Sequence, residues 1–128
     1  MDIQYHQAFQ SELDRFVRKH CYGDMTVEKV LKQHEKILRG HFERQSLISP
    51  NHLGLAQGFG DYTIYFWHML IDNCHLKRKQ QPKCYFYRQD NLIVLLCCDS
   101  HINNYADSKL RSTARERLYE LLEDLQSP

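Results

Sequence analysis

Seven consecutive apolar residues, Leu92-Ile93-Val94-Leu95-Leu96-Cys97-Cys98, restrict what this chain can fold into. A strand with one face in water alternates apolar and polar residues, and this run does not alternate. We therefore expect Leu92–Cys98 to be a central strand that is buried on both faces, with helices covering at least one side. The run is far shorter than the roughly 20 apolar residues that span a bilayer, so we expect no membrane partner.

Two segments before this run also have the composition of strands. Tyr62–Leu70 and Lys83–Tyr87 are rich in aromatic and β-branched residues. Arg88–Asn91 is a turn signal of hairpin length that leads into Leu92–Cys98. Ile3–Tyr5 is a candidate for a short first strand. These segments predict a small twisted, mainly antiparallel sheet of about four strands.

Apolar residues at helical spacing predict three helices. The first covers Ala8–His20, and the second has Thr26 as its N-cap and stops near Gly40. The third covers residues 110–125. Residues 40–60, which contain one proline and several glycines, are expected to be loop. The predicted order is β-α-α-β-β-β-α, an α+β fold with the helices packed on one face of the sheet.

Length and composition indicate one soluble domain over residues 1–128. Hydrophobic residues make up 42% of the chain and charged residues 26%, which is the usual balance for a globular protein. Residues 1–10 are polar and lack the apolar stretch of a secretory signal. The five cysteines are an odd number without C-x-x-C pairs, which suits a reducing compartment. We therefore expect a cytoplasmic protein.

Positive charge is concentrated in one segment. The formal net charge of the chain is +1, whereas residues 73–89 carry five basic side chains and no acidic one. This segment predicts a local site for an anion, such as a phosphate group. A solvated lysine-rich loop is the alternative. The basic residues are Lys77, Arg78, Lys79, Lys83 and Arg88.

The order of elements and several local motifs resemble the RelE-type toxins of bacterial toxin–antitoxin modules, and the YafO-like branch in particular. The first motif is an opening strand followed by a helix with apolar residues at fixed spacing. The second is a pair of aromatic strands, and the third is a last strand that runs into a short polar loop. These motifs are Ile3–Phe9 with Leu13 and Phe16, Asp61–Phe66 with Cys84–Tyr87, and Leu92–Cys98 with Asp99-Ser100-His101.

The resemblance implies a ribosome-dependent endoribonuclease. Such toxins cut mRNA codons in the ribosomal A site, inhibit translation, and are neutralised by a cognate antitoxin protein. The implied partners are therefore mRNA on the ribosome and an antitoxin. The implied chemistry needs no cofactor and no metal.

Metal-independent RNA cleavage uses the 2′-OH as an internal nucleophile. It needs a base for this hydroxyl, an acid for the 5′-oxygen and cations for the phosphorane charge. The resemblance places the acid just beyond the last strand, at His101 or at Tyr105. Arg88 is the candidate phosphate clamp because a guanidinium is bidentate and always charged. His68, near a strand end, is a further catalytic candidate, and its alternative is a half-buried sheet histidine.

The same segment supplies candidates for RNA binding. Lys77, Arg78, Lys79 and Lys83 are candidates for phosphate contacts. Tyr85 and Tyr87 share one face of their strand and are candidates for stacking on bases, although packing in the core explains them equally well.

Two alternatives remain open. Cys98 and His101, with Cys74, His75 and Cys84 upstream, have a zinc-like pattern, but Cys98 continues an apolar strand and no second ligand pair has zinc spacing. The low net charge and the acidic final helix also fit a non-catalytic interaction module, such as an immunity protein or an antitoxin-like inhibitor.

Overall fold

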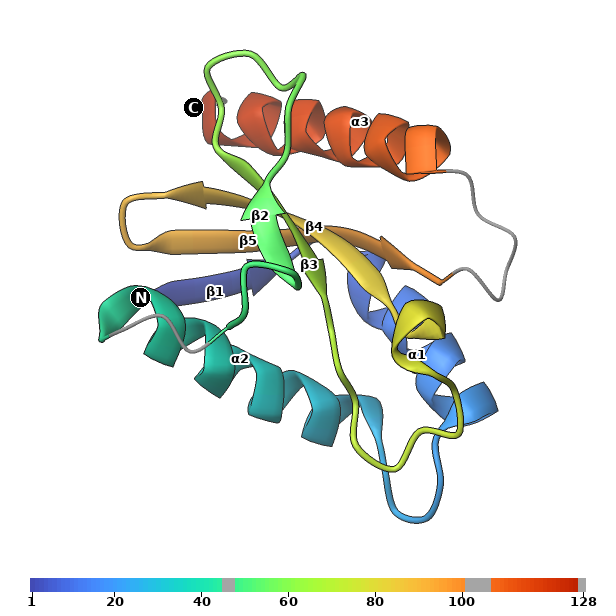
Figure 1. The fold of residues 1–128 in the computed structure, drawn as a ribbon. Helices are drawn as coiled ribbons and strands as arrows, with labels where there is room; N and C mark the ends of the chain where they lie inside the picture. Colours follow the sequence, from blue (N-terminus) through green and yellow to red (C-terminus); the bar gives the residue numbers. More distant parts are fainter. Residues whose placement is uncertain (45–47, 101–106, 127–128) are drawn as a thin grey trace.

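The computed structural model of the protein describes residues 1–44, 48–100 and 107–126. Over these ranges the chain forms five strands, three α-helices and one short 3-10 helix, η1 (Figure 1). In chain order the elements are β1 (Asp2–Tyr5), α1 (Phe9–His20), α2 (Val27–Glu43), β2 (Leu53–Leu55), β3 (Ile64–His68), η1 (Arg78–Gln80), β4 (Lys83–Gln89), β5 (Leu92–Asp99) and α3 (Asp107–Gln126).

The strands form one mixed sheet in the order β1-β5-β4-β3-β2. β1 runs parallel to β5, and the other neighbouring strands are antiparallel. The α+β class and the order of the expected elements are confirmed. Leu92–Cys98 lies within β5, between β1 and β4, and its interior position is confirmed as well.

Helices cover both faces of this sheet. α1 and α2 pack on one face, where Phe9 and Leu13 meet Ile93 in the larger core. α3 packs on the opposite face, where Leu118 meets Val94 in a second core, and Figure 1 shows α3 on the other side of the sheet from α1 and α2. The expectation of a single helical face thus holds for α1 and α2, whereas α3 lies opposite them. An apolar strand needs cover on both faces, and α3 supplies the second.

A β-bulge shifts the alternation of β5 between the two cores. The pairing between β4 and β5 shifts register at Tyr85 and Phe86. As a result, Leu96 and Cys97 both belong to the core beneath α3, whereas Cys98 belongs to the core beneath α1 and α2. The bulge therefore sets the direction in which the end of β5 presents its side chains.

β2 is a strand in the stretch that the sequence predicted to be loop. Gly54 of β2 lies opposite Phe66 of β3. A Cβ atom on Gly54 would lie 2.7 Å from the Phe66 ring, so the ring packs directly on the glycine backbone. The glycine that suggested a loop therefore permits a close approach within the sheet.

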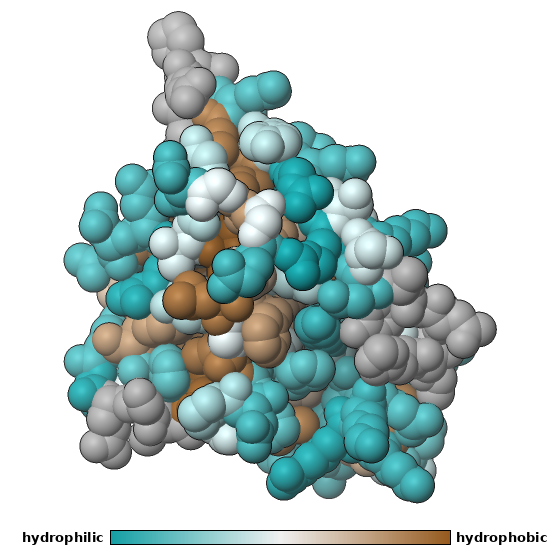
Figure 2. Space-filling model, turned by 45° about the horizontal axis from the view of Figure 1, so that its top comes forward, coloured by the Kyte–Doolittle hydropathy of each residue, from teal (hydrophilic) through white to brown (hydrophobic). Residues whose placement is uncertain are grey.

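Thr26 is the N-cap of α2, as predicted, because its hydroxyl accepts a hydrogen bond of 3.2 Å from the Lys29 backbone N–H. Within the described ranges, no helix combines the length and the apolar character needed to cross a membrane. α3 packs against β5 and β4, and Leu55 in the edge strand β2 remains exposed. Figure 2, a view turned toward α3, shows apolar side chains gathered in a band between hydrophilic ones.

Candidate functional site

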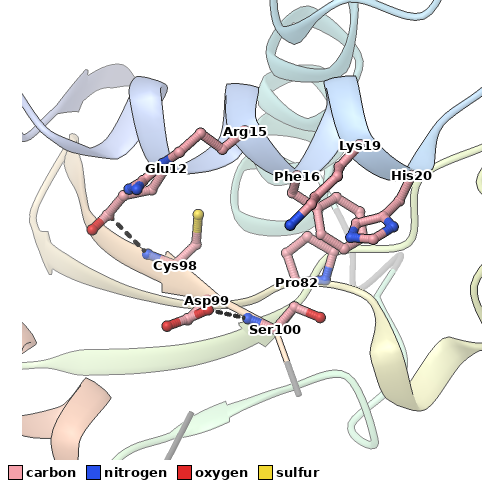
Figure 3. A pocket seen from close by; sticks show the side chains of 9 residues that line it. All are labelled: Glu12, Arg15, Phe16, Lys19, His20, Pro82, Cys98, Asp99 and Ser100. Atoms are coloured by element: carbon pink, nitrogen blue, oxygen red, sulfur yellow. Dashed lines mark hydrogen bonds between the residues drawn. The ribbon is translucent and has the colours of Figure 1, made fainter. Parts of the chain in front are cut away.

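A cavity of about 340 Å³ lies between α1 and the point where β5 ends and β4 begins. Lys83 at the start of β4 pairs with Asp99 at the end of β5, so the two strand ends form one wall. Figure 3 shows side chains of α1 on the opposite wall, with Lys19 reaching toward the strand ends. The cavity is lined by Glu12, Arg15, Phe16, Lys19, His20, Pro82, Cys98, Asp99 and Ser100.

The α1 wall carries positive charge. Arg15 and Lys19 are exposed cations one helical turn apart, and both line the cavity. The carboxylate of Glu12 on the same helix is already matched by Arg117 of α3, at 2.8 and 2.9 Å. Arg15 and Lys19 are therefore well placed to bind an anionic group that enters the cavity.

His20 lines the cavity as a buried imidazole. Its Nδ1 has no hydrogen-bond partner among the described residues. Burial, with the neighbouring His75 and Lys19, lowers the pKa of His20 below its usual range. The ring is therefore neutral at pH 7.

Two anchored residues flank the segment 101–106. Before it, the Ser100 side chain donates a hydrogen bond to the backbone oxygen of Gln80, and the Ser100 backbone N–H donates to Asp99 Oδ1 at 2.7 Å. After it, the Asp107 carboxylate accepts from Lys83 at 2.7 Å and from the Tyr85 hydroxyl at 3.0 Å. The predicted catalytic residues His101 and Tyr105 lie outside the described residues. Ser100 and Asp107, the described residues on either side, are both held by residues at or next to the start of β4.

His68 and Lys83 both lie at this end of the sheet, where they pair across β3 and β4. The Lys83 ammonium forms an ion pair with Asp107 and lies over the rings of Phe66 and Tyr85. Asp107, far downstream in the sequence, therefore neutralises one of the five basic charges. His68 is half-buried and lines a second cavity of about 440 Å³.

Three other basic residues of this segment lie at the surface. Lys77, Arg78 and Lys79 are exposed, and they have no ion-pair partner in the described part of the chain. They sit at η1, whose last residue, Gln80, binds the Ser100 hydroxyl. Of these three cations, Arg78 lines the second cavity together with His68.

Arg88 does not join this group. It is five residues from Lys83 along β4, which corresponds to about 17 Å. Its guanidinium lies over the Phe42 ring, 4.2 Å from the ring centre, and its Nε is buried without a hydrogen-bond partner among the described residues. His68 and Arg88, both predicted as catalytic, therefore occupy opposite ends of the strand pair.

Tyr85 and Tyr87 share one face of β4, as predicted, but α3 covers that face. The two residues are 2% and 4% exposed, and both belong to the core beneath α3. The Tyr85 hydroxyl is bound to Asp107 and the Tyr87 hydroxyl to Gln89. Of the two roles considered for these rings, core packing is the one that the structure shows.

Arg15, Lys19 and His20 were missed because the sequence pattern assigns them to an ordinary amphipathic helix. A spacing of four residues between Arg15 and Lys19 does place both side chains on one side of α1. Their position opposite Ser100, however, depends on how α1 crosses the sheet. In the described residues no three metal-ligating side chains come together.

No family model matches the sequence, and no curated protein is found as a relative. Among solved structures the chain is similar to a mutant toxin from Helicobacter pylori, whose crystal structure was determined with copper bound. The two chains are 17% identical, the TM-score is 0.48, and the match covers 82% of this chain and 99% of the toxin. We therefore base the assignment of a function on the site itself.

Proposed function

We propose that this protein is the toxin of a toxin–antitoxin pair and cleaves mRNA on the ribosome. One observation carries the proposal. At the end of β5, a cavity with two exposed cations and a neutral histidine on its α1 wall borders Ser100, the residue before His101. This is the combination of groups that transesterification of RNA requires.

In this proposal the proton transfers belong to two histidines. His20 is a neutral imidazole on the α1 wall of the cavity, and we assign it the role of the base that removes the proton of the 2′-OH. The 2′-oxygen attacks the adjacent phosphorus, and the bond to the 5′-oxygen breaks. His101 protonates the leaving 5′-oxygen, with Tyr105 as the alternative acid and His68 as a further candidate. The products are a 2′,3′-cyclic phosphate and a 5′-hydroxyl.

In this proposal the cations of α1 stabilise the negative charge of the phosphorane. Arg15 and Lys19 line the cavity, whereas Arg88 is at the far end of β4 against Phe42. We therefore move the phosphate-clamp role from Arg88 to Arg15 and Lys19. The exposed Lys77, Arg78 and Lys79 then hold neighbouring phosphates of the RNA.

The direct test is single-turnover cleavage of mRNA on programmed ribosomes. His101→Ala should lower the rate roughly 10²- to 10⁴-fold, because it removes the general acid. Lys19→Gln should lower it roughly 10²-fold, because it removes one charge that stabilises the phosphorane. Lys36→Gln, an exposed lysine of α2 outside the cavity, is the matched control and should retain the wild-type rate. Circular dichroism checks that each variant is folded.

A loss below about tenfold for His101→Ala would assign the acid role to Tyr105 or His68. Absence of cleavage by the wild type would reject the nuclease.

A non-catalytic interaction module is the second candidate. The observation in its favour is the acidic surface of α3, where Glu116, Glu120, Glu123 and Asp124 are exposed. Induced expression separates the two functions, because a toxin arrests growth and the His101→Ala variant relieves the arrest. An immunity protein or inhibitor should not arrest growth at all.

A further inference from the structure

Cys21 and Cys74 face each other across a short antiparallel bridge outside the main sheet. Cys21 directly follows α1, and Cys74 lies in the connection that leads to η1. The bridge is held by two backbone hydrogen bonds, from Tyr22 N–H to Asn73 O at 2.7 Å and from His75 N–H to His20 O at 3.1 Å. It fixes the two cysteines opposite each other although they are far apart in sequence.

The bonding pattern determines how close the two side chains are. The hydrogen bonds flank the cysteines on both sides, so Cys21 and Cys74 form a non-hydrogen-bonded pair. In such pairs the Cα atoms are typically about 4.5 Å apart and the side chains approach closely. Disulfides form at Cα separations of about 4.4–6.8 Å, so the backbone geometry suits a bond between the two sulfur atoms.

A second facing pair within the sheet provides a contrast. Cys84 of β4 pairs with Cys98 of β5, but these residues are 0% and 5% exposed. Cys21 and Cys74 are both half-exposed. A dissolved oxidant therefore reaches one of the two facing pairs and not the other.

We propose that Cys21 and Cys74 form a reversible disulfide by exchange with a small-molecule disulfide such as oxidised glutathione. The Cys74 thiolate attacks one sulfur of the small disulfide and releases one small thiolate. Cys21 then loses its proton and attacks the Cys74 sulfur, which releases the second thiolate. The protein gives up two electrons and two protons, and the small disulfide is reduced to two thiols.

The thiol of Cys21 is partly buried against Cys74. Burial, together with the charge and hydrogen bonding of Cys74, raises the pKa of the Cys21 thiol to about 12. In the proposed exchange Cys74 is the attacking thiol and Cys21 the resolving thiol. The bond ties the end of α1, where His20 lines the cavity, to the segment that carries Lys77, Arg78 and Lys79.

The test is thiol mapping of the full-length protein in glutathione buffers of graded redox ratio. Remaining thiols are alkylated, and the digested protein is examined by mass spectrometry. We expect a peptide pair joined through Cys21 and Cys74, whereas Cys84 and Cys98 stay as thiols that are alkylated only after unfolding. The melting temperature of the oxidised protein should rise by roughly 5–15 °C, because the bond closes a long loop of the chain.

Two variants test the assigned roles. Cys21→Ser should abolish the cross-link and accumulate a glutathione adduct on Cys74, while Cys84→Ser should leave the cross-link intact. A Cys74 that stays fully reduced under these conditions in the wild type would overturn the proposal, as would cross-linking of Cys84 to Cys98 at an equal rate. The thiol map of the wild-type protein tests the disulfide without RNA. Its outcome is therefore independent of the nuclease proposal.

Discussion

At the residue scale, the ion pair between Glu12 and Arg117 covers the part of β5 that has no neighbouring strand on one edge among the described residues. β1 ends at Tyr5, opposite Leu95, so within the described ranges the later part of β5 has no strand beside it on that edge. There Arg117 donates to Leu96 O at 2.8 Å, and the Cys98 backbone N–H donates to Glu12 at 3.3 Å. The ion pair between Glu12 of α1 and Arg117 of α3 joins the two helices around the edge of the sheet. It covers backbone groups of β5 that are otherwise open to a second chain.

We expect Arg117→Ala to lower the free energy of unfolding by about 2–4 kcal/mol. The substitution removes the cation from the Glu12 carboxylate, which keeps its hydrogen bond from the Cys98 backbone N–H, and it removes the donor to the bulge carbonyl of Leu96. Urea denaturation measures the change. Arg18→Ala is the control, because Arg18 pairs with Asp14 while its side chain is 80% exposed, and exposed pairs contribute little. Equal effects of the two variants would contradict the structural role of Arg117.

Asp107 gives a pH-dependent prediction at the same scale. Burial alone would raise its pKa, but hydrogen bonds from Lys83 and Tyr85 hold the pKa of Asp107 below its usual value near 3.8. The carboxylate therefore adds stability above its unfolded-state pKa, and this stability is lost as the pH falls through the lower folded-state pKa.

We expect Asp107→Asn to be less stable than the wild type at pH 7 and to approach the wild type at acidic pH. Thermal melts of both proteins between pH 7 and pH 2 measure this convergence. A stability difference that stays constant over the whole range would show that the charge of Asp107 is not the stabilising feature.

At the element scale, β5 holds the fold together because it contributes side chains to both cores. Ile93 lies beneath α1 and α2, and Val94 lies beneath α3. The bulge at Leu96 and Cys97 then shifts the alternation by one residue before the strand reaches Asp99 and Ser100. The strand β5, which contributes to both cores, therefore also sets the direction of the side chains with which it lines the cavity.

Val94→Asp should cost several kcal/mol and prevent folding, because it places an unpaired carboxylate in the core beneath α3. Leu55→Asp in the edge strand β2 is the control. It introduces the same charge into the same sheet at an exposed position, and it should cost less than about 1 kcal/mol. Soluble expression and circular dichroism measure both effects. A folded Val94→Asp variant would refute the burial of this face of β5.

At the scale of the whole molecule, positive charge is distributed unevenly over the chain. The formal net charge is only +1, yet five exposed cations lie on two short segments of the chain. Two of them come from α1 and three from the segment at η1, while Lys83 is neutralised by Asp107. These five residues are Arg15, Lys19, Lys77, Arg78 and Lys79.

The proposed binding of RNA should therefore be strongly salt-dependent. Changing Lys77, Arg78 and Lys79 to Ala should weaken binding and flatten the plot of log affinity against log salt by about 0.7 for each phosphate that is no longer neutralised. Titrations at several salt concentrations measure the slope. Changing Lys32 and Lys36 of α2 to Ala, which also removes exposed charge, should leave the slope unchanged. An unaltered slope in the triple variant would remove η1 from the RNA interface.

The sequence by itself determined the features that depend on neighbouring residues. The apolar run predicted an interior strand, the spacing of apolar residues predicted α1 and α2, and Thr26 predicted a helix cap. Burial, helical periodicity and capping are local consequences of side-chain chemistry. The exposed basic segment was predictable for the same reason, since Lys77, Arg78 and Lys79 have no acidic neighbour in the chain.

Only the tertiary structure decided the contacts between distant residues. Lys83 is neutralised by Asp107, Phe66 covers Gly54, and α3 buries Tyr85. None of these contacts leaves a local signal, because each depends on the face of the sheet that α3 covers or on the register between strands. The position of Arg15, Lys19 and His20 opposite Ser100 was decided in the same way, by the crossing of α1 over the end of β5.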